Sequence, residues 1–128
     1  MSDALSNYLE NKLLDLVLRK QSYTAHDIYV GLFTSDPTDV GTGTEVSGGS
    51  YARQAVTFTS PTGGATSNTA DIYFPAASAA WGTVTHFALF DAVTGGNILF
   101  HGTLDIPKII NTADQFKFPQ GYIIPSLS

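Results

Sequence analysis

The fold is decided by one stretch of the chain, Trp81-Gly-Thr-Val-Thr-His-Phe-Ala-Leu-Phe-Asp-Ala-Val-Thr-Gly-Gly-Asn-Ile-Leu-Phe-His101. Residues 84–90 and 98–104 are rich in β-branched and aromatic side chains, and the seven residues between them are rich in turn formers. Gly95 and Gly96 can adopt the positive φ angles that a tight connection between two strands requires. This stretch therefore predicts a β-hairpin.

The first strand of this hairpin carries apolar residues on both of its faces. By strict alternation, Val84 and Phe90 share one face, whereas Phe87 and Leu89 lie on the other. A strand that is apolar on both faces must be covered on both sides. We therefore expect the hairpin to lie at the centre of a two-layer β structure.

A helical pattern near the N-terminus predicts a helix over about residues 4–20. Asn7 followed three residues later by Glu10 resembles a capping box. Leu14 and Leu18 make the apolar stripe wider than one docking face requires, and leaving either leucine in water forgoes roughly 1.5–3 kcal/mol. The helix must lie in a groove of its own domain or meet another subunit. The stripe has three- and four-residue spacing and consists of Leu5, Leu9, Leu13, Leu16 and Val17.

The remainder of the chain reads as short strands separated by turns. A proline at position 107 is expected to interrupt the strand that follows the hairpin turn. With the hairpin, the pattern predicts seven to eight strands in a single domain, residues 1–128. The predicted fold is mainly β, an N-terminal helix followed by an antiparallel, jelly-roll-like β-sandwich over about residues 27–125. The further strand-like segments are residues 27–34, 51–59, 67–74, 115–118 and the apolar tail from 121.

Composition narrows the classes of partner. The net charge is −5, from 11 acidic and 6 basic residues, and most of the basic residues are scattered, which disfavours nucleic acid. There is no cysteine, so disulfides and thiolate metal sites are excluded. No run of about 20 apolar residues predicts a membrane span, and no secretory signal is apparent. We expect a soluble protein that is made in a cytoplasm.

Residues 39–50 contain four glycines and raise the hypothesis of a phosphate-binding loop. No Gly-Lys-Ser/Thr follows them, and the next predicted element is a strand rather than a helix. We interpret the segment as a long mobile connection.

The sequence contains only weak signals for a catalytic site or a metal site. His86 and His101 lie on neighbouring strands of the predicted hairpin, but no compact metal-ligand spacing is present, which favours structural or surface histidines. No Gly-x-Ser-x-Gly motif marks a serine hydrolase, and a carboxylate pair for glycoside cleavage stays open because its distance depends on the fold. We expect no enzyme activity, no cofactor and no metal. The carboxylates considered beside the histidines are Asp71, Asp91 and Asp105.

Several runs of the sequence resemble one known family. They are Leu5-Ser-Asn-Tyr-Leu-Glu-Asn-Lys-Leu-Leu14, Tyr29-Val-Gly-Leu-Phe-Thr-Ser-Asp-Pro-Thr38, Gly43-Thr-Glu-Val-Ser-Gly-Gly-Ser-Tyr-Ala-Arg-Gln-Ala-Val56, Trp81-Gly-Thr-Val-Thr-His-Phe-Ala-Leu-Phe-Asp91 and Gly96-Asn-Ile-Leu-Phe-His-Gly102. Together they resemble the small structural proteins of tailed-bacteriophage virions, which are described either as tail fibre proteins or as capsid decoration (cement) proteins. The final ten residues carry no matching motif.

The resemblance implies a virion protein, and the absence of repeats or a coiled stalk favours the capsid. We expect a homotrimer on the outside of the head shell that binds the major capsid protein and stabilises contacts between its subunits. Such binding would use apolar burial and strand addition. The residues expected at the assembly interface are Leu5, Leu9, Leu13, Leu14, Leu18, Tyr122, Ile123 and Ile124.

Two alternatives remain at this point. A tail or baseplate component with a receptor-binding role would present aromatic residues on an exposed face, with Tyr51, Tyr73 and Trp81 as candidates for stacking on a sugar. Trp81 alone is more typical of a core residue. A small virion enzyme would instead depend on His86 or His101.

Overall fold

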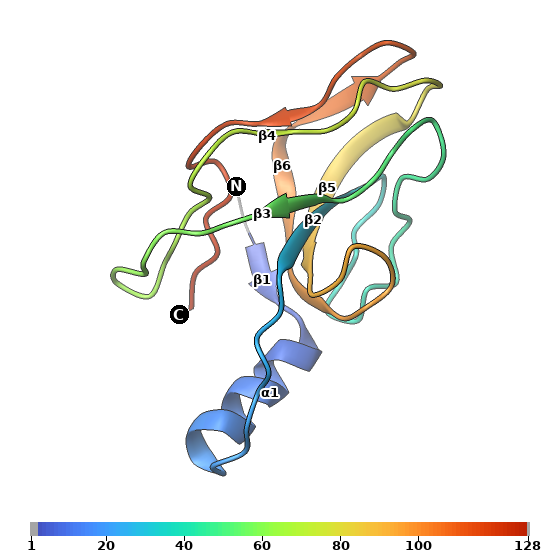
Figure 1. The fold of residues 1–128 in the computed structure, drawn as a ribbon. Coiled ribbons are helices and arrows are strands. Elements are labelled where there is room, and N and C mark those ends of the chain that lie inside the picture. Colours follow the sequence, from blue (N-terminus) through green and yellow to red (C-terminus); the bar gives the residue numbers. More distant parts are fainter. Residues whose placement is uncertain (1–2, 128) are drawn as a thin grey trace.

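The computed structural model describes residues 3–127, and its architecture is mainly β, as predicted (Figure 1). Seven strands form two antiparallel sheets, a five-stranded sheet in the order β1-β6-β5-β2-β3 and a two-stranded sheet of β4 and β7. The second layer has strands of only two residues, so the sandwich is confirmed in part. The elements are β1 (Asp3–Leu5), α1 (Asn7–Leu18), β2 (Ile28–Phe33), β3 (Gln54–Val56), β4 (Ile72–Tyr73), β5 (Gly82–Phe90), β6 (Ile98–Ile110) and β7 (Lys117–Phe118).

The predicted hairpin is confirmed as β5 and β6, and β5 is the middle strand of the large sheet. The Asp91 carboxylate accepts hydrogen bonds from the backbone N–H and the side-chain amide of Asn97, at 2.7 and 3.0 Å. Gly95 and Gly96 have φ angles of 61° and 73°. The turn chemistry read from the sequence therefore closes this hairpin.

A bulge in the hairpin changes the predicted assignment of faces. Val84 pairs with Lys108 and His86 pairs with Thr103, so four residues of β6 lie opposite one residue of β5. This irregularity turns Val84 into the same buried cluster as Phe87 and Leu89, and the prediction that Val84 shares a face with Phe90 is wrong. The bulge also accommodates a proline at position 107, which therefore does not end β6.

The main core fills the space between the two sheets. Phe74 is completely buried, and Trp81 lies beside it as a core residue, with its indole N–H donating to the Gly49 carbonyl at 2.9 Å. A smaller cluster on the other face of the large sheet contains Phe90 and Ile98. Both faces of β5 are thus covered, as its apolar pattern requires. The rings within 6.5 Å of the Phe74 ring centroid are Tyr51, Trp81, Phe116 and Phe118.

The glycine-rich segment is tied to β2 by backbone hydrogen bonds. The N–H of Thr34 donates to the Thr44 carbonyl, and the N–H of Val46 donates to the Leu32 carbonyl, both at 2.9 Å. Val46 is buried in the main core. The segment is therefore an anchored part of the fold, and its interpretation as a mobile connection does not fit this structure.

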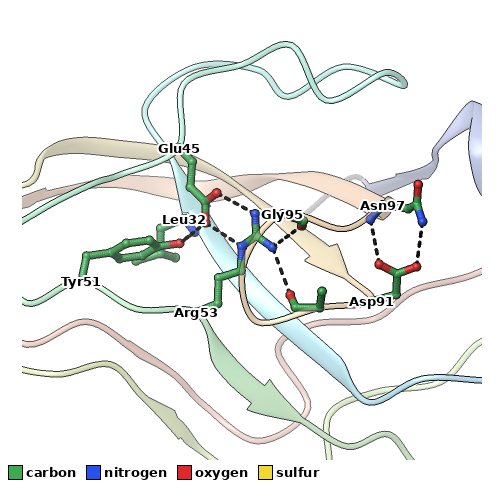
Figure 2. A network of polar contacts seen from close by, with 8 residues as sticks. Leu32, Glu45, Tyr51, Arg53, Asp91, Gly95 and Asn97 are labelled. Atoms are coloured by element: carbon green, nitrogen blue, oxygen red, sulfur yellow. Dashed lines mark hydrogen bonds and ion pairs between the residues drawn. The ribbon is translucent and has the colours of Figure 1, made fainter.

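A polar network centred on Arg53 joins this segment to the β5–β6 turn, as Figure 2 shows. The guanidinium donates to both carboxylate oxygens of Glu45, at 2.8 and 2.9 Å, and to the carbonyls of Ala92 and Gly95, at 3.0 and 2.8 Å. Its central carbon lies 3.5 Å from the centroid of the Phe90 ring. One cation thus holds two loops that are far apart in the sequence.

Tyr51 completes the network from the core side. Its hydroxyl donates to the Glu45 carboxylate at 2.6 Å and accepts from the backbone N–H of Leu32 at 2.9 Å. Burial, together with the hydrogen bond to Glu45, raises the pKa of the Tyr51 hydroxyl far above its ordinary value. The phenol is therefore neutral at neutral pH, where it donates a hydrogen bond to the Glu45 carboxylate.

Replacing Asp91 with Asn is expected to remove a pH-dependent part of the stability. Burial raises the pKa of the Asp91 carboxyl, but the hydrogen bonds from Asn97 outweigh this effect and the net pKa is lowered from 3.8. A lowered folded-state pKa gives stability that is present above pH 3.8 and is lost as the pH falls through the folded value. Urea unfolding should show Asp91→Asn less stable than the original protein by up to about 1 kcal/mol at pH 7, with a smaller gap at pH 3. An equal gap at both pH values would contradict this assignment.

Candidate assembly surface

Ser6 fixes the position and the start of α1. Its hydroxyl accepts from the N–H of Leu9 at 3.1 Å and donates to the Ile98 carbonyl at 2.6 Å, while its own N–H donates to the Leu99 carbonyl at 2.9 Å. Ser6 is therefore the N-cap, and the predicted capping box of Asn7 with Glu10 is wrong.

The residues before Ser6 form a strand instead of an earlier helical turn. β1 pairs with β6, with Leu5 opposite Phe100. The edge of β6 offers backbone hydrogen bonds at this point, and they outweigh the helical spacing of the leucines. The predicted helix start near residue 4 is therefore corrected to Asn7.

α1 extends away from the strands and buries none of its residues (Figure 1). Its second half is apolar over a wide arc, with Leu14 56% exposed and Leu18 73% exposed. A helix of 12 residues is marginal in water unless another surface covers its apolar side. Contact with another molecule would therefore stabilise α1. The exposed apolar residues of α1 are Leu14, Leu16, Val17 and Leu18.

An apolar groove of about 300 Å³ lies between α1 and the C-terminal segment. Leu9 and Leu13 of α1 line one side, and Phe58 and residues 125–127 line the other. The C-terminal segment is held there by backbone hydrogen bonds from Thr66 N–H to the Pro125 carbonyl and from Leu127 N–H to the Gly64 carbonyl. The sheet residues that complete the groove are Ile28, Leu89, Leu99 and Phe100.

The structure divides the predicted helix residues between two surfaces. Leu9 and Leu13 are half-buried in the groove, whereas Leu14 and Leu18 are exposed and do not line it. Leu5 is half-buried in β1. The helix therefore presents one apolar side to its own domain and another to the surroundings.

The predicted C-terminal residues lie in three different environments. Ile123 is completely buried in the core and offers no surface to a partner in this conformation. Tyr122 is half-buried, and its hydroxyl accepts from the Asp105 N–H at 3.1 Å. Ile124 is 47% exposed, on a hollow separate from the groove. The structure brings the helix and the C-terminal segment together, but through residues 125–127.

Sequence reasoning did not place Val17, Phe58 or Leu127 at this surface. Val17 belongs to the helical stripe and could have been found from its spacing. Phe58 and Leu127 had no such signal, because only the folded backbone brings their segments next to α1.

The two histidines considered as metal ligands do not converge. The His101 Nε2 atom lies 2.8 Å from an Asp39 carboxylate oxygen, and the His86 Nδ1 atom lies 2.7 Å from the Thr85 hydroxyl. Within residues 3–127, no group of three or more His, Asp or Glu side chains is placed to hold a metal ion. Asp71 accepts from the Gln120 N–H, which lowers the pKa of its carboxyl.

The three aromatic residues considered for sugar stacking do not form one exposed cluster. Tyr51 and Trp81 contact each other edge to face inside the main core, with ring centroids 5.4 Å apart. Tyr73 is exposed, with the Lys117 ammonium 5.5 Å from its ring centroid. These residues therefore offer no aromatic platform for a receptor glycan.

Comparison with known proteins gives the family. A family model described as podophage GP4 fiber I protein gp80 matches residues 4–125. The chain belongs to this family. Membership confirms the resemblance to small structural proteins of tailed-phage virions, and the matched region includes α1 and most of the groove. A search of curated proteins found no match. No helix within the described residues is long and apolar enough to cross a membrane.

Proposed function

We propose that the chain is a subunit of the fibre apparatus of a tailed phage, fixed in the virion by protein–protein contacts of its apolar helix. The observation that carries this proposal is the match to a fibre protein family over residues 4–125. The exposed apolar side of α1 supports it, because an assembly protein needs a surface that is stable only in contact.

Apolar burial supplies the binding free energy in this proposal, and no catalytic step is required. Leu14, Val17 and Leu18 are each more than half exposed. Covering each of them contributes roughly 1–2 kcal/mol. Association opposes this gain through lost translational and rotational freedom. The helix alone therefore gives a modest contact, and a stable position in the virion requires several contacts per particle.

A second candidate function is decoration of the capsid, in which the chain binds the outside of the head shell and stabilises contacts between major capsid protein subunits. The compact fold supports this candidate, because residues 3–127 form a small two-layer β structure without a repeat or a coiled stalk. A homotrimer would suit either location.

Quantitative mass spectrometry of purified virions, combined with immunogold labelling, separates the two candidates. A small number of copies per particle, with label at the tail or neck, is the result expected for a fibre subunit. A copy number comparable to that of the major capsid protein, with label over the head, would support decoration instead. Absence of the chain from purified particles would overturn both.

A further inference from the structure

We propose that α1 of one copy docks into the apolar groove of a second copy, so that the chain assembles with itself head to tail. This inference rests on the structural role proposed above and names the partner in it. Two surfaces take part. The helix face consists of Leu14, Val17 and Leu18, and the groove is the apolar hollow between α1 and residues 125–127.

Within residues 3–127, the helix face has no partner in its own chain. Leu14 and Leu18 are four residues apart and lie on one side of α1, with Val17 beside them. Leu9 and Leu13 instead line the groove of the same chain. The intramolecular contact therefore uses one side of the helix and leaves the helix face uncovered.

The groove matches the helix face in size and chemistry. Its volume is about 300 Å³, roughly twice that of a ~150 Å³ cavity that holds benzene, so it has room for about two leucine side chains. Leu14 and Leu18 provide two such side chains at the spacing of one helical turn. Almost none of the exposed surface of the lining is polar, so a polar occupant would lose its hydrogen bonds to water without replacement.

Charge favours a second copy as the occupant. Three of the six basic residues of the chain, Lys12, Arg19 and Lys20, lie within or directly after α1, which also carries the acidic Glu10 and Asp15, so residues 7–20 have a net charge of +1. Eight of the eleven acidic residues lie beyond residue 20. Asp27 is exposed and is next to Ile28, which lines the groove. A docking helix therefore brings a segment with a net charge of +1 to a body with a net charge of −5, from eight acidic and three basic residues beyond residue 20, which favours encounter and orientation.

The contact joins two different surfaces of the same chain, so it is heterologous. Such contacts close into a ring when the rotation between copies permits it. In a closed ring each copy uses its helix face once and its groove once. Each copy then takes part in two contacts, whereas a copy in an open dimer takes part in one. The expected product is a cyclic homo-oligomer, and a trimer is one such ring.

The test uses purified protein and size-exclusion chromatography with light scattering, at concentrations up to about 1 mM, where contacts with a Kd of that order are populated. The original protein is expected to form an oligomer, and the double variant Leu14→Gln, Leu18→Gln is expected to be monomeric. Glutamine keeps the helix because its helix propensity is close to that of leucine. The control Ile106→Gln removes a residue that is 65% exposed on β6 and should leave the oligomer intact.

A variant of the groove distinguishes helix-in-groove docking from symmetric helix–helix contact. Pro61→Arg with Leu127→Arg changes two exposed residues of the groove and should also give a monomer. An equal mixture of helix and groove variants should form a dimer, because one intact helix face then meets one intact groove. An oligomer that survives the groove variant would overturn the proposal in favour of symmetric helix–helix contact. A monomeric original protein would also overturn it, although detection of the chain in virions would still support the proposed function.

Discussion

Replacing Arg53 with Ala is expected to lower the free energy of unfolding by about 3–5 kcal/mol. The Arg53 side chain is 8% exposed and the Glu45 side chain 24% exposed, so removal of the cation leaves a largely buried carboxylate without its ion-pair partner. The carbonyls of Ala92 and Gly95 also lose their donor. Urea unfolding followed by circular dichroism measures the change, which should lower the transition midpoint without changing its slope.

Two further variants show whether the stability lost in Arg53→Ala comes from the hydrogen-bond network or from the positive charge alone. Arg19→Ala breaks an exposed ion pair with Asp15 on α1, where the two side chains are 69% and 37% exposed, and should change the unfolding free energy by less than about 1 kcal/mol. Arg53→Lys keeps the charge but loses the bidentate contact with Glu45. Its decrease in unfolding free energy should therefore lie between those of Arg53→Ala and Arg19→Ala. Equal effects of Arg53→Ala and Arg19→Ala would contradict the stabilising role of the network.

Replacing Phe74 with Ala is expected to cost about 3–5 kcal/mol of unfolding free energy. Phe74 is completely buried, and its ring contacts aromatic residues from the large sheet side and from the segment around β7. The substitution opens a cavity between the two layers, where neighbouring rings cannot close in without losing their own contacts. Since domains of this kind are stable by only about 5–15 kcal/mol, the loss is a large fraction of the total.

The neighbouring residue provides the matched control. Tyr73 is 53% exposed and points away from the core, so Tyr73→Ala should cost less than about 1 kcal/mol. Thermal unfolding of both variants under the same conditions gives the comparison. Similar melting temperatures for the two variants would show that the small sheet does not pack on the large one through Phe74.

The sequence predicted the fold class because its local signals agreed. The turn residues between β5 and β6 specified the hairpin, and apolar residues on both faces of β5 specified two covering layers. The structural details that the sequence did not predict correctly depend on tertiary contacts. The bulge opposite Thr85, the continuation of β6 through a proline and the pairing of residues 3–5 as β1 are set by neighbouring strands. Alternation and helical spacing within one segment contain no information about those neighbours.

The candidate assembly surface was predicted in part for a similar reason. Helical spacing identified Leu14 and Leu18 as more apolar surface than one docking face requires, and both are exposed. It could not divide the leucines between the groove and the helix face, because that division depends on how Ser6 directs the helix from β6. The C-terminal segment was chosen for its apolar character, but only the fold decides that Ile123 is buried while Leu127 lines the groove.

Incorporation into virions tests the central claim that the apolar surface of α1 fixes this protein in the phage particle. Phage carrying Leu14→Gln with Leu18→Gln, and phage carrying the control Ile106→Gln, are purified, and the copy number of the chain per particle is measured by quantitative mass spectrometry. We predict at least about a tenfold loss of the chain from particles for the helix variant, equivalent to about 1.4 kcal/mol of lost binding, with normal incorporation of the control. Normal incorporation of the helix variant would contradict this claim.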